Sequence, residues 1–480
     1  MATKKDLVEA YSFSRRRLVT AFLSGAPGGR EVEPARPGRT VVGGLALAVL
    51  LIAGAAIASV LASRTPEDWN KIGLIATRGD QPAAYVILEE AESPQLVPVI
   101  NLTSAQLILG ADVKATWVDQ EVVDEQTPGI PIGILGAPQT LPRPEQFIES
   151  GWTACTDDQV GIAVDVSHQE RVERTTSEAI VVQSADAYWL IATSSSQEGR
   201  EQRTYRYPIS EEESDQLLVD FRLGARAQAI TVPAEWLALF PEGGEIGADG
   251  FGVPHLGEPA EDSPVAGAKV GDYIPLGDGG AMVVDGGFQP IDGFALAVLK
   301  NAGLPSGGPT ALSGGPPQDY DEPAYLASHW PDTSPAPLSS PPCAQLDAAP
   351  GQVPRAWLAG SPTGNAESPE QGAEGEIPDD QRRVTVDRGH GAFALDGTWD
   401  STSSESMLVI DPLGKAYPLS GGPITLEKLG YDPDDASVVP DEWVSLFDEG
   451  VSLLTYAALC PPASQPGKEQ PAENCQALPQ

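Results

Sequence analysis

The sequence predicts a single N-terminal transmembrane helix followed by a β-rich α+β domain built from four short repeats. Three observations support this: a long apolar segment without charges, a high glycine and proline content, and a recurring pattern of strand, turn and short helix. The 50 Gly and 45 Pro among 480 residues disfavour long regular elements, so strands and loops should predominate. One such repeat buries too little apolar surface alone, so the repeats should pack on one another in an elongated, quasi-twofold body.

The overall charge excludes one large class of function. The chain has 68 acidic and 29 basic side chains and a formal net charge of −39. No basic face remains to neutralise phosphates, which argues against nucleic-acid binding. A hydrophobic content of 41% is sufficient for a sizeable core. With 4 Cys and 4 His, a dense disulfide scaffold and a His-rich metal site are both disfavoured.

Residues 1–39 are predicted to form a cytoplasmic leader. Apolar or small side chains recur every three or four residues and predict an amphipathic helix from Lys4 to Leu23. These side chains are Leu7, Ala10, Tyr11, Ser14, Leu18, Ala21 and Phe22. The adjacent Arg15, Arg16 and Arg17 either fix membrane topology or belong to a docking helix, and periodicity does not separate these interpretations. Gly25 to Arg39 should form a flexible connection.

Residues 40–63 carry the predicted transmembrane helix. This 24-residue segment has no charge and, at about 1.5 Å per residue, is long enough to cross about 30 Å. A cleavable signal peptide is disfavoured because the segment lies behind a long leader. The leader has a net charge of +4, and the chain from Arg64 onward has a net charge of −43. The positive-inside rule therefore predicts a cytoplasmic N-terminus and an exported domain over residues 64–460.

Four repeats are predicted near residues 84–110, 187–224, 280–303 and 406–430. Each has an apolar strand, a Pro followed by an aliphatic residue, and a short helix closed by Gly. The segments 232–243 (VPAEWLALFPEG) and 439–450 (VPDEWVSLFDEG) share eight of twelve residues, which chance explains poorly. The expected N-terminal caps of the four helices are Thr103, Ser210, Asp292 and Thr425.

The four cysteines are Cys155, Cys343, Cys460 and Cys475. An even number outside the membrane favours disulfides, and three connectivities are possible. The segments 302–342 and 354–380 are rich in Pro, Gly, Ser and acidic residues and are predicted to be mobile. Residues 461–480 form a Pro-rich tail.

Motifs of known catalytic chemistry are not found in the sequence. Gly414-Lys415 is followed by Ala416, so the phosphate-binding pattern is incomplete, and Gly389 to Ala394 precedes a turn where a dinucleotide site needs a helix. No G-x-S-x-G or H-E-x-x-H motif occurs. The four histidines are isolated: His168, His255, His329 and His390. We therefore assign no catalytic, metal-binding or cofactor-binding residue from the sequence.

Several segments carry a family resemblance. They are Thr3-Lys4 with Leu7, Tyr11, Phe13 and Arg15 to Arg17; Thr65 to Trp69; Pro98 to Ala105 (PVINLTSA) with Leu107 to Gly110; Gly133-Ile134 with Gly136 to Pro138; and Trp152 with Cys155. Together with the single apolar span, they resemble the EccB family, a core membrane component of the type VII (ESX) secretion system of actinobacteria. The resemblance covers essentially the whole chain.

The resemblance implies more than the residues alone do. It implies a single-pass inner-membrane protein whose four periplasmic repeats surround a central β-rich domain in a distorted propeller. It implies a structural role in a channel complex with EccC, EccD, EccE and the mycosin protease, and self-association of periplasmic domains. It also implies the disulfide Cys155–Cys343, while the tail pair Cys460 and Cys475 has no such support.

Two alternative functions stay open at this point. The EccB family often carries an ATPase label, which would make ATP a ligand, although no phosphate-binding motif is found. A cell-wall-binding membrane protein is the other alternative. In the structural interpretation, Tyr11, Phe13, Arg15, Arg16 and Arg17 dock cytoplasmic partners. Gly360 to Asp380 departs from the family pattern, so contacts in that loop are in doubt.

Overall fold

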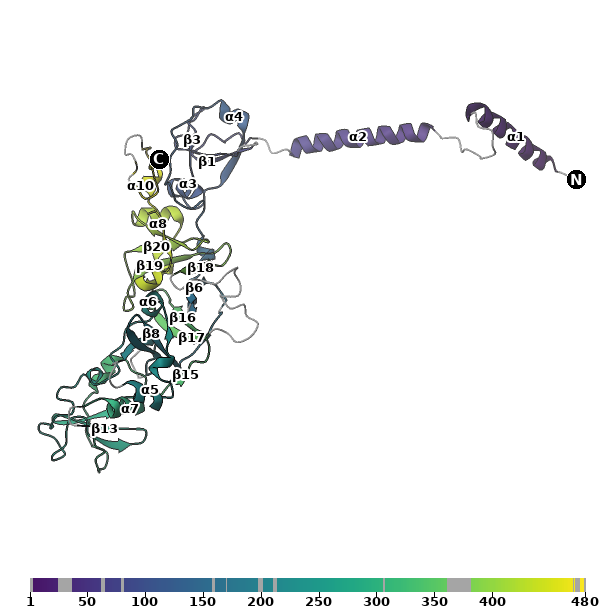
Figure 1. The fold of residues 1–480 in the computed structure, drawn as a ribbon. Helices are drawn as coiled ribbons and strands as arrows, with labels where there is room; N and C mark the ends of the chain where they lie inside the picture. Colours follow the sequence, from purple (N-terminus) through teal and green to yellow (C-terminus); the bar gives the residue numbers. More distant parts are fainter. Residues whose placement is uncertain are drawn as a thin grey trace. The chain divides into compact units, whose positions relative to one another are not determined.

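The computed structural model describes residues 3–24, 37–61, 65–78, 82–157, 160–169, 171–196, 202–209, 214–304, 307–360, 381–468, 470 and 475–478. The chain divides into two compact units, Met1–Thr65 and Pro66–Gln480 (Figure 1). Each is described by itself. The predicted flexible connection after the first helix falls largely on residues 25–36, and the predicted loop departure on residues 361–380, both outside the described residues.

The first unit contains two helices, α1 (Lys4–Ser24) and α2 (Pro37–Leu61). Helix α1 matches the predicted leader helix, and the backbone N–H and hydroxyl of Thr3 both donate to the Asp6 carboxylate at 2.9 and 2.7 Å. These bonds lower the pKa of Asp6. Helix α2 covers most of the segment 40–63. Among the described residues, the structure contains no helix that is both long and apolar enough to span a membrane, so the transmembrane helix stays a prediction.

The second unit is β-rich with short helices. The strand connectivity of its first sheet recurs in two other sheets of the unit. The strands are β1 (Gly73–Arg78), β2 (Ala84–Ile87), β3 (Val97–Pro98) and β4 (Ala115–Asp119), in the order β3-β2-β1-β4. The first three strands are antiparallel neighbours, whereas β4 returns parallel to β1. Helix α3 (Leu102–Leu109) precedes β4, and α4 (Gln120–Asp124) follows it.

Two further sheets have the same connectivity. One contains β8 (Glu178–Ser184), β9 (Ala187–Thr193), β10 (Thr204–Ile209) and β11 (Ile230–Thr231), in the order β10-β9-β8-β11. The other contains β19 (Ala392–Gly397), β20 (Met407–Ile410), β21 (Lys415–Leu419) and β22 (Ser437–Pro440), with β23 (Asp448–Glu449) beside β21. In both, the fourth strand is parallel to the first. The crossovers contain α5 (Ser214–Asp220) and α8 (Pro423–Leu429).

The remaining predicted repeat contains a three-stranded sheet in the order β12-β13-β14. Its elements are β12 (Tyr273–Leu276), β13 (Gly279–Val284), β14 (Gly287–Ile291) and α7 (Gly293–Asn301). After α7, Ala311 forms a parallel bridge to Tyr273 of β12. This single bridge takes the position that the parallel fourth strand has in the three sheets described above.

The helix caps correct part of the sequence prediction. Asp292 caps α7 as predicted, since its carboxylate accepts from Ala295 N at 2.8 Å. Helix α3, however, is capped by Asn101, whose side chain accepts from Ser104 N, and α8 begins after Gly422. Thr103 and Thr425 were wrongly expected as caps because both side chains are buried inside their helices. Ser210 lies outside the described residues.

A six-stranded sheet in the order β18-β6-β5-β16-β17-β7 lies at the centre of the second unit (Figure 1). Its strands are β5 (Trp152–Asp157), β6 (Val160–Val166), β7 (Glu173–Arg174), β16 (Pro342–Asp347), β17 (Arg355–Gly360) and β18 (Arg382–Val386). Strands β5 and β16 are antiparallel, and their register places Cys155 opposite Cys343. The sheet thus joins segments from both halves of the chain.

The two matching twelve-residue segments form equivalent structures, around α6 (Ala234–Ala238) and α9 (Asp441–Val444). Trp236 and Trp443 are fully buried, and their Nε1 atoms donate to Ala154 O at 2.8 Å and Leu239 O at 3.2 Å. Both tryptophans belong to the core against the central sheet, together with Trp152 and Phe447. The sequence match therefore reflects two equivalent anchors in one core.

Two other cores flank the central one. A second core joins the β8–β11 sheet to β13, α5 and α7, where the rings of Phe221 and Phe294 stack at 4.7 Å. A third core joins the first sheet to the β19–β22 sheet. In it, Leu107 of α3 and Leu429 of α8 are buried, and Gln106 Nε2 donates to Leu429 O. The first and last predicted repeats thus share one core.

The two segments predicted to be mobile contain regular structure and buried side chains. Within 302–342, η4 (Ala324–Ser328) precedes β15 (Ala336–Pro337), and Tyr325 and Trp330 are buried in the second core. Residues 355–360 form β17 of the central sheet. The first stretch lacks apolar periodicity because it contributes isolated large side chains to an existing core, whereas residues 355–360 form a strand buried on both faces. The other short elements are η1 (Pro144–Gln146), η2 (Arg226–Gln228), η3 (Asp249–Phe251), η5 (Pro433–Asp435) and α10 (Thr455–Ala458).

Asp292, the N-terminal cap of α7, should make stability depend on pH. Burial raises its pKa to about 6, and the nearby Asp332 carboxylate adds to this, although bonds from Ala295 N and the Tyr325 hydroxyl oppose it. The unfolded chain binds this proton with an ordinary pKa of 3.8, so ionisation of Asp292 disfavours the folded state. The stability that the proton confers is complete below about pH 4 and is lost as the pH rises through about 6.

We expect Asp292→Asn to remove this contribution, because Asn keeps the cap without the charge. The difference in unfolding free energy between about pH 4 and about pH 8 should shrink by about 2 kcal/mol relative to the wild type. Denaturant unfolding across this pH range measures it. The exposed Asp278→Asn is the control and should retain the wild-type profile. An Asp292→Asn profile identical to that of the control would contradict the assignment.

Candidate functional site

The predicted docking residues lie together on α1. The side chains of Tyr11, Phe13, Arg15, Arg16 and Arg17 are all exposed within the first unit. Tyr11 and Arg15 are four residues apart and therefore lie on the same side of the helix. The helix thus presents aromatic and cationic groups to solvent, as a docking surface or a headgroup-binding surface requires.

Both possible cysteine pairs are disulfides in the structure. Cys155–Cys343 joins β5 to β16 across 188 residues and is buried beside Val172 and Ala359. This is the pair that the family resemblance implied. Cys460–Cys475 joins the end of the last helix to the tail. Nearby, Gln470 Nε2 donates to Gly133 O, and Gly133 N donates to Cys460 O. The tail therefore packs against the loop that follows the first sheet.

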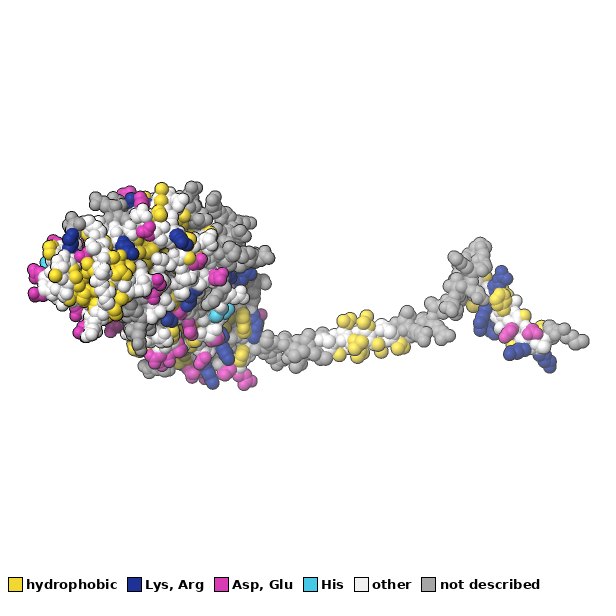
Figure 2. Space-filling model, turned by 90° about the horizontal axis from the view of Figure 1, so that it is seen from below, with side chains coloured by type: hydrophobic (Ala, Val, Ile, Leu, Met, Phe, Trp, Pro, Cys, Tyr) yellow, Lys and Arg dark blue, Asp and Glu magenta, His cyan; other side chains and the backbone are white. Residues whose placement is uncertain are grey.

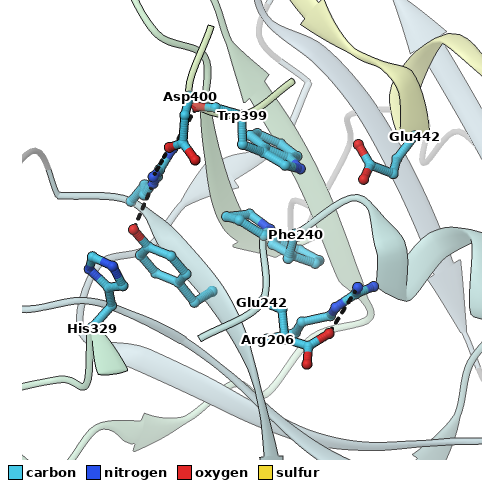
Figure 3. Close-up of a pocket in the computed structure, with 10 residues that line it drawn as sticks. Arg206, Phe240, Glu242, His329, Trp399, Asp400 and Glu442 are labelled. Atoms are coloured by element: carbon cyan, nitrogen blue, oxygen red, sulfur yellow. Dashed lines mark hydrogen bonds and ion pairs between the residues drawn. The ribbon is translucent and has the colours of Figure 1, made fainter. Parts of the chain in front are cut away.

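A pocket of about 430 Å³ lies in the second unit (Figure 3). Strand β10 and the segment before it, the loop after α6, the loop after β19 and helix α9 contribute side chains to it. The lining residues are Arg203, Tyr205, Arg206, Phe240, Pro241, Glu242, His329, Trp399, Asp400 and Glu442. Its volume lies within the range of about 300–1,000 Å³ that is typical of ligand sites.

Arg203 forms one fixed wall of the pocket. Its guanidinium donates to Asp400 Oδ1 at 2.9 Å, Tyr205 Oη at 2.8 Å and Trp399 O at 2.8 Å. Burial alone would lower its pKa, but the bonds to Tyr205 and Asp400 outweigh burial and raise it. The positive charge is therefore permanent and already engaged. The ring of His329 stacks on the ring of Tyr205, with their centroids 4.7 Å apart.

Arg206 and Glu242 form a second ion pair, with Nη2 and Oε2 3.3 Å apart (Figure 3). The Arg206 guanidinium also lies over the ring of Trp189, 5.5 Å from its centroid. Phe240 is fully buried between the two ion pairs. Both arginines of the pocket therefore have carboxylate partners within the chain.

The third carboxylate of the pocket belongs to Glu442, which forms no ion pair with any described residue. Figure 3 shows its side chain facing Trp399, whose ring nitrogen points toward it. Trp399 is only 8% exposed, and its Nε1 has no hydrogen-bond partner among the described residues. The equivalent of Glu442 in the matching segment is Glu235, which pairs with Arg382 at 3.7 Å. The two segments thus differ in how this glutamate is neutralised.

Two neighbouring carboxyl groups, Asp396 and Asp441, belong to elements that adjoin the pocket residues Trp399 and Glu442. Asp396, in the strand that leads to Trp399, is next to Asp441, which begins the helix of Glu442. Burial, and to a smaller extent the Asp441 carboxyl, raise the pKa of Asp396 to about 6. Protonation of Asp396 therefore reduces negative charge close to the pocket below about this pH.

The electrostatics of the pocket select against anions. Three carboxylates line it, and its two arginines are already paired. A triphosphate would add several negative charges without a free cation to meet them, so this pocket does not suit a nucleotide. Figure 2 shows acidic side chains spread over one face of the second unit, with fewer basic ones among them.

Sequence reasoning did not predict this pocket. His329 was noted only as isolated, and the other lining residues come from segments far apart in the chain. One signal was available: Phe240, Pro241 and Glu242 end one of the two matching segments, and Glu442 lies in the other. A comparison of the two segments would have pointed to this part of the fold.

These features define a class of protein: a β-rich α+β domain of connected small sheets, closed by long-range disulfides and preceded by a separate helical unit. The chain belongs to the EccB family, because residues 1–463 match the family model described as "Type VII secretion system ESX-1, transport TM domain B". The sequence resemblance is thereby confirmed.

Curated relatives and solved structures agree with this family. The ESX-3 secretion system ATPase EccB3 of Mycobacterium tuberculosis is 27% identical over 505 aligned residues, covering 92% of this chain and 87% of the relative. The structure of an intact ESX-5 inner membrane complex contains a chain with 22% identity and a TM-score of 0.58, covering 98% of both chains. The EccB3 dimer from the ESX-3 core complex gives 20% identity and a TM-score of 0.56, covering 80% of this chain and 99% of that one. These structural likenesses establish the fold.

Proposed function

We propose that this protein is a structural subunit of a type VII (ESX) secretion complex in the bacterial inner membrane. The family match over residues 1–463 carries this proposal. The similar solved chains come from an ESX-5 inner membrane complex and from an EccB3 dimer, which supports incorporation into a membrane complex and self-association. The partners that the family resemblance implies are EccC, EccD, EccE and the mycosin protease.

The proposed topology follows from the distribution of charge and hydropathy. Residues 1–39 lie in the cytoplasm, residues 40–63 cross the membrane, and residues 64–460 form the periplasmic domain. The positive leader and the strongly acidic second unit support this orientation. Two disulfides also suit an oxidising compartment.

The periplasmic domain is proposed to consist of four repeats around the central sheet, in a distorted propeller. The shared strand order of three sheets and the parallel bridge to β12 support a common origin of the units. The matching segments around Trp236 and Trp443 support it further. A repeat array of this kind offers extended surfaces for assembly and needs no active site.

The assembly role can be tested by purification from native membranes. We expect the full chain, solubilised in mild detergent and recovered by a C-terminal tag, to copurify in a large complex with the other ESX membrane components. Arg16→Glu with Arg17→Glu should reduce this yield several-fold, because it reverses the charge of the proposed docking surface on α1. Size-exclusion chromatography with mass spectrometry of the copurifying proteins measures both results.

The control reverses two exposed cations of the second unit, Lys71→Glu with Arg143→Glu, whose side chains are 62% and 75% exposed. This variant should assemble as the wild type does. Equal yields from both double variants would argue against a docking leader. Recovery of the wild-type chain without any partner would refute the structural-subunit proposal itself.

A further inference from the structure

We propose that the pocket between β10 and α9 binds a basic peptide segment, whose Lys or Arg side chain pairs with Glu442 and whose main-chain carbonyl accepts from Trp399 Nε1. This inference goes beyond assembly in general, because it assigns one site and the chemistry of its ligand. It needs no catalytic step.

The first argument is the charge balance inside the pocket. The charges cancel within the Arg203–Asp400 pair and within the Arg206–Glu242 pair. Glu442 therefore remains as an additional negative charge. In the matching segment, the equivalent Glu235 has a cationic partner, Arg382, and Glu442 has no such partner among the described residues. A cationic side chain from another molecule would give Glu442 the partner that its counterpart already has. Such charge-assisted bonds are the strong ones in partly buried sites.

The second argument is the buried indole N–H of Trp399. Buried donors are nearly always hydrogen-bonded, so an unpartnered donor in a pocket wall calls for an explanation. Its ring nitrogen is directed toward Glu442, so one ligand entering there meets an acceptor and a donor together (Figure 3). An extended peptide supplies both groups, because its carbonyl accepts while its basic side chain donates.

The third argument concerns approach to the site. The chain from Arg64 onward carries a net charge of −43, so its overall field attracts cations and repels anions. Asp400 and Glu242 are the exposed members of the two ion pairs and lie at the pocket. A basic peptide is therefore steered toward this opening, whereas a neutral saccharide gains nothing from the field.

Titration of the full-length, detergent-solubilised protein with fluorescent pentapeptides tests the inference. The probes are Gly-Gly-Lys-Gly-Gly, acetylated at the N-terminus and amidated at the C-terminus, and the same blocked peptide with neutral norleucine in place of lysine. We expect the lysine peptide to bind at least about fivefold more tightly than the norleucine peptide. Its affinity should fall as the salt concentration rises from about 50 to about 300 mM.

Variants localise the binding. Glu442→Gln should weaken binding of the lysine peptide at least about fivefold, and Trp399→Phe should weaken both peptides. Glu449→Gln is the matched control: it removes the same charge at the repeat equivalent of Glu242, outside the pocket, and should leave affinity within about twofold. Thermal unfolding of each variant establishes that it is folded.

Three results would overturn the inference. They are equal affinity for both peptides, equal effects of Glu442→Gln and Glu449→Gln, and the absence of peptide binding. Binding of a neutral oligosaccharide such as chitotriose, insensitive to salt and weakened by Glu442→Gln, would assign the pocket to a saccharide and refute the peptide. None of these results depends on complex assembly, so the structural role proposed above is tested separately.

Discussion

Replacing Cys155 and Cys343 together by Ala should destabilise the folded chain by about 3–5 kcal/mol. The bond closes a loop with a sequence separation of 188, and the loss of chain entropy in the unfolded state grows with loop length. The loop estimate gives about 5 kcal/mol, and measured values often fall below it. The double substitution avoids leaving one buried thiol unpaired.

Thermal unfolding under non-reducing conditions, followed by tryptophan fluorescence, measures this effect. The comparison variant replaces Cys460 and Cys475 by Ala, a pair with a separation of 15 residues. Its entropic contribution is about 3 kcal/mol, so the central pair should cause the larger loss. Unfolding curves of the central variant that match the wild type would show that β5 and β16 do not depend on the bond.

Trp443→Ala should cost a comparable amount, about 3–5 kcal/mol. The side chain is fully buried, and its Nε1 donates to Leu239 O within the other matching segment. Alanine leaves a large cavity in the central core and an unmet carbonyl acceptor. Trp236→Ala removes the equivalent anchor and should have a similar effect, since it loses the bond to Ala154 O.

Trp117→Ala is the matched control for this substitution. Trp117 lies on β4 and is 50% exposed, so its loss should change stability by no more than about 0.5 kcal/mol. Denaturant midpoints of the three variants measure the comparison. If Trp443→Ala and Trp117→Ala unfold at the same denaturant concentration, then the α9 segment does not anchor the central core.

The sequence predicted one strand and one helix in each of the four repeat segments, because local patterns determine these elements; it did not predict the strands of the central sheet. The strands and helices around Val86, Leu107, Phe294 and Leu426 lie where apolar spacing placed them. The caps were less predictable, since Asn101 and Thr103 are both good cap residues and only tertiary burial of Thr103 decides between them.

Two other features depend on tertiary contacts that a local pattern does not contain. Tyr325 and Trp330 are single aromatic residues in a Pro- and Gly-rich segment, and only the second core explains their burial. The pocket is even harder to predict from local patterns, because its residues are far apart in the sequence. Arg203 and Asp400, which are hydrogen-bonded there, are separated by 197 residues. No spacing rule connects residues so far apart.

The shared core of the first and last sheets has a consequence for biogenesis. Gln106 of α3 bonds to Leu429 of α8 across 323 residues, and the tail contacts the loop at Gly133. Contacts of such high sequence separation slow folding, because the entropy of loop closure must be overcome first. Synthesis begins at the N-terminus, so the first sheet is made long before the β19–β22 sheet that shares its core. The first sheet therefore cannot complete this core until that later sheet has been synthesised. This interval is when the protein is most exposed to aggregation and proteolysis, and when a holding chaperone would be most effective.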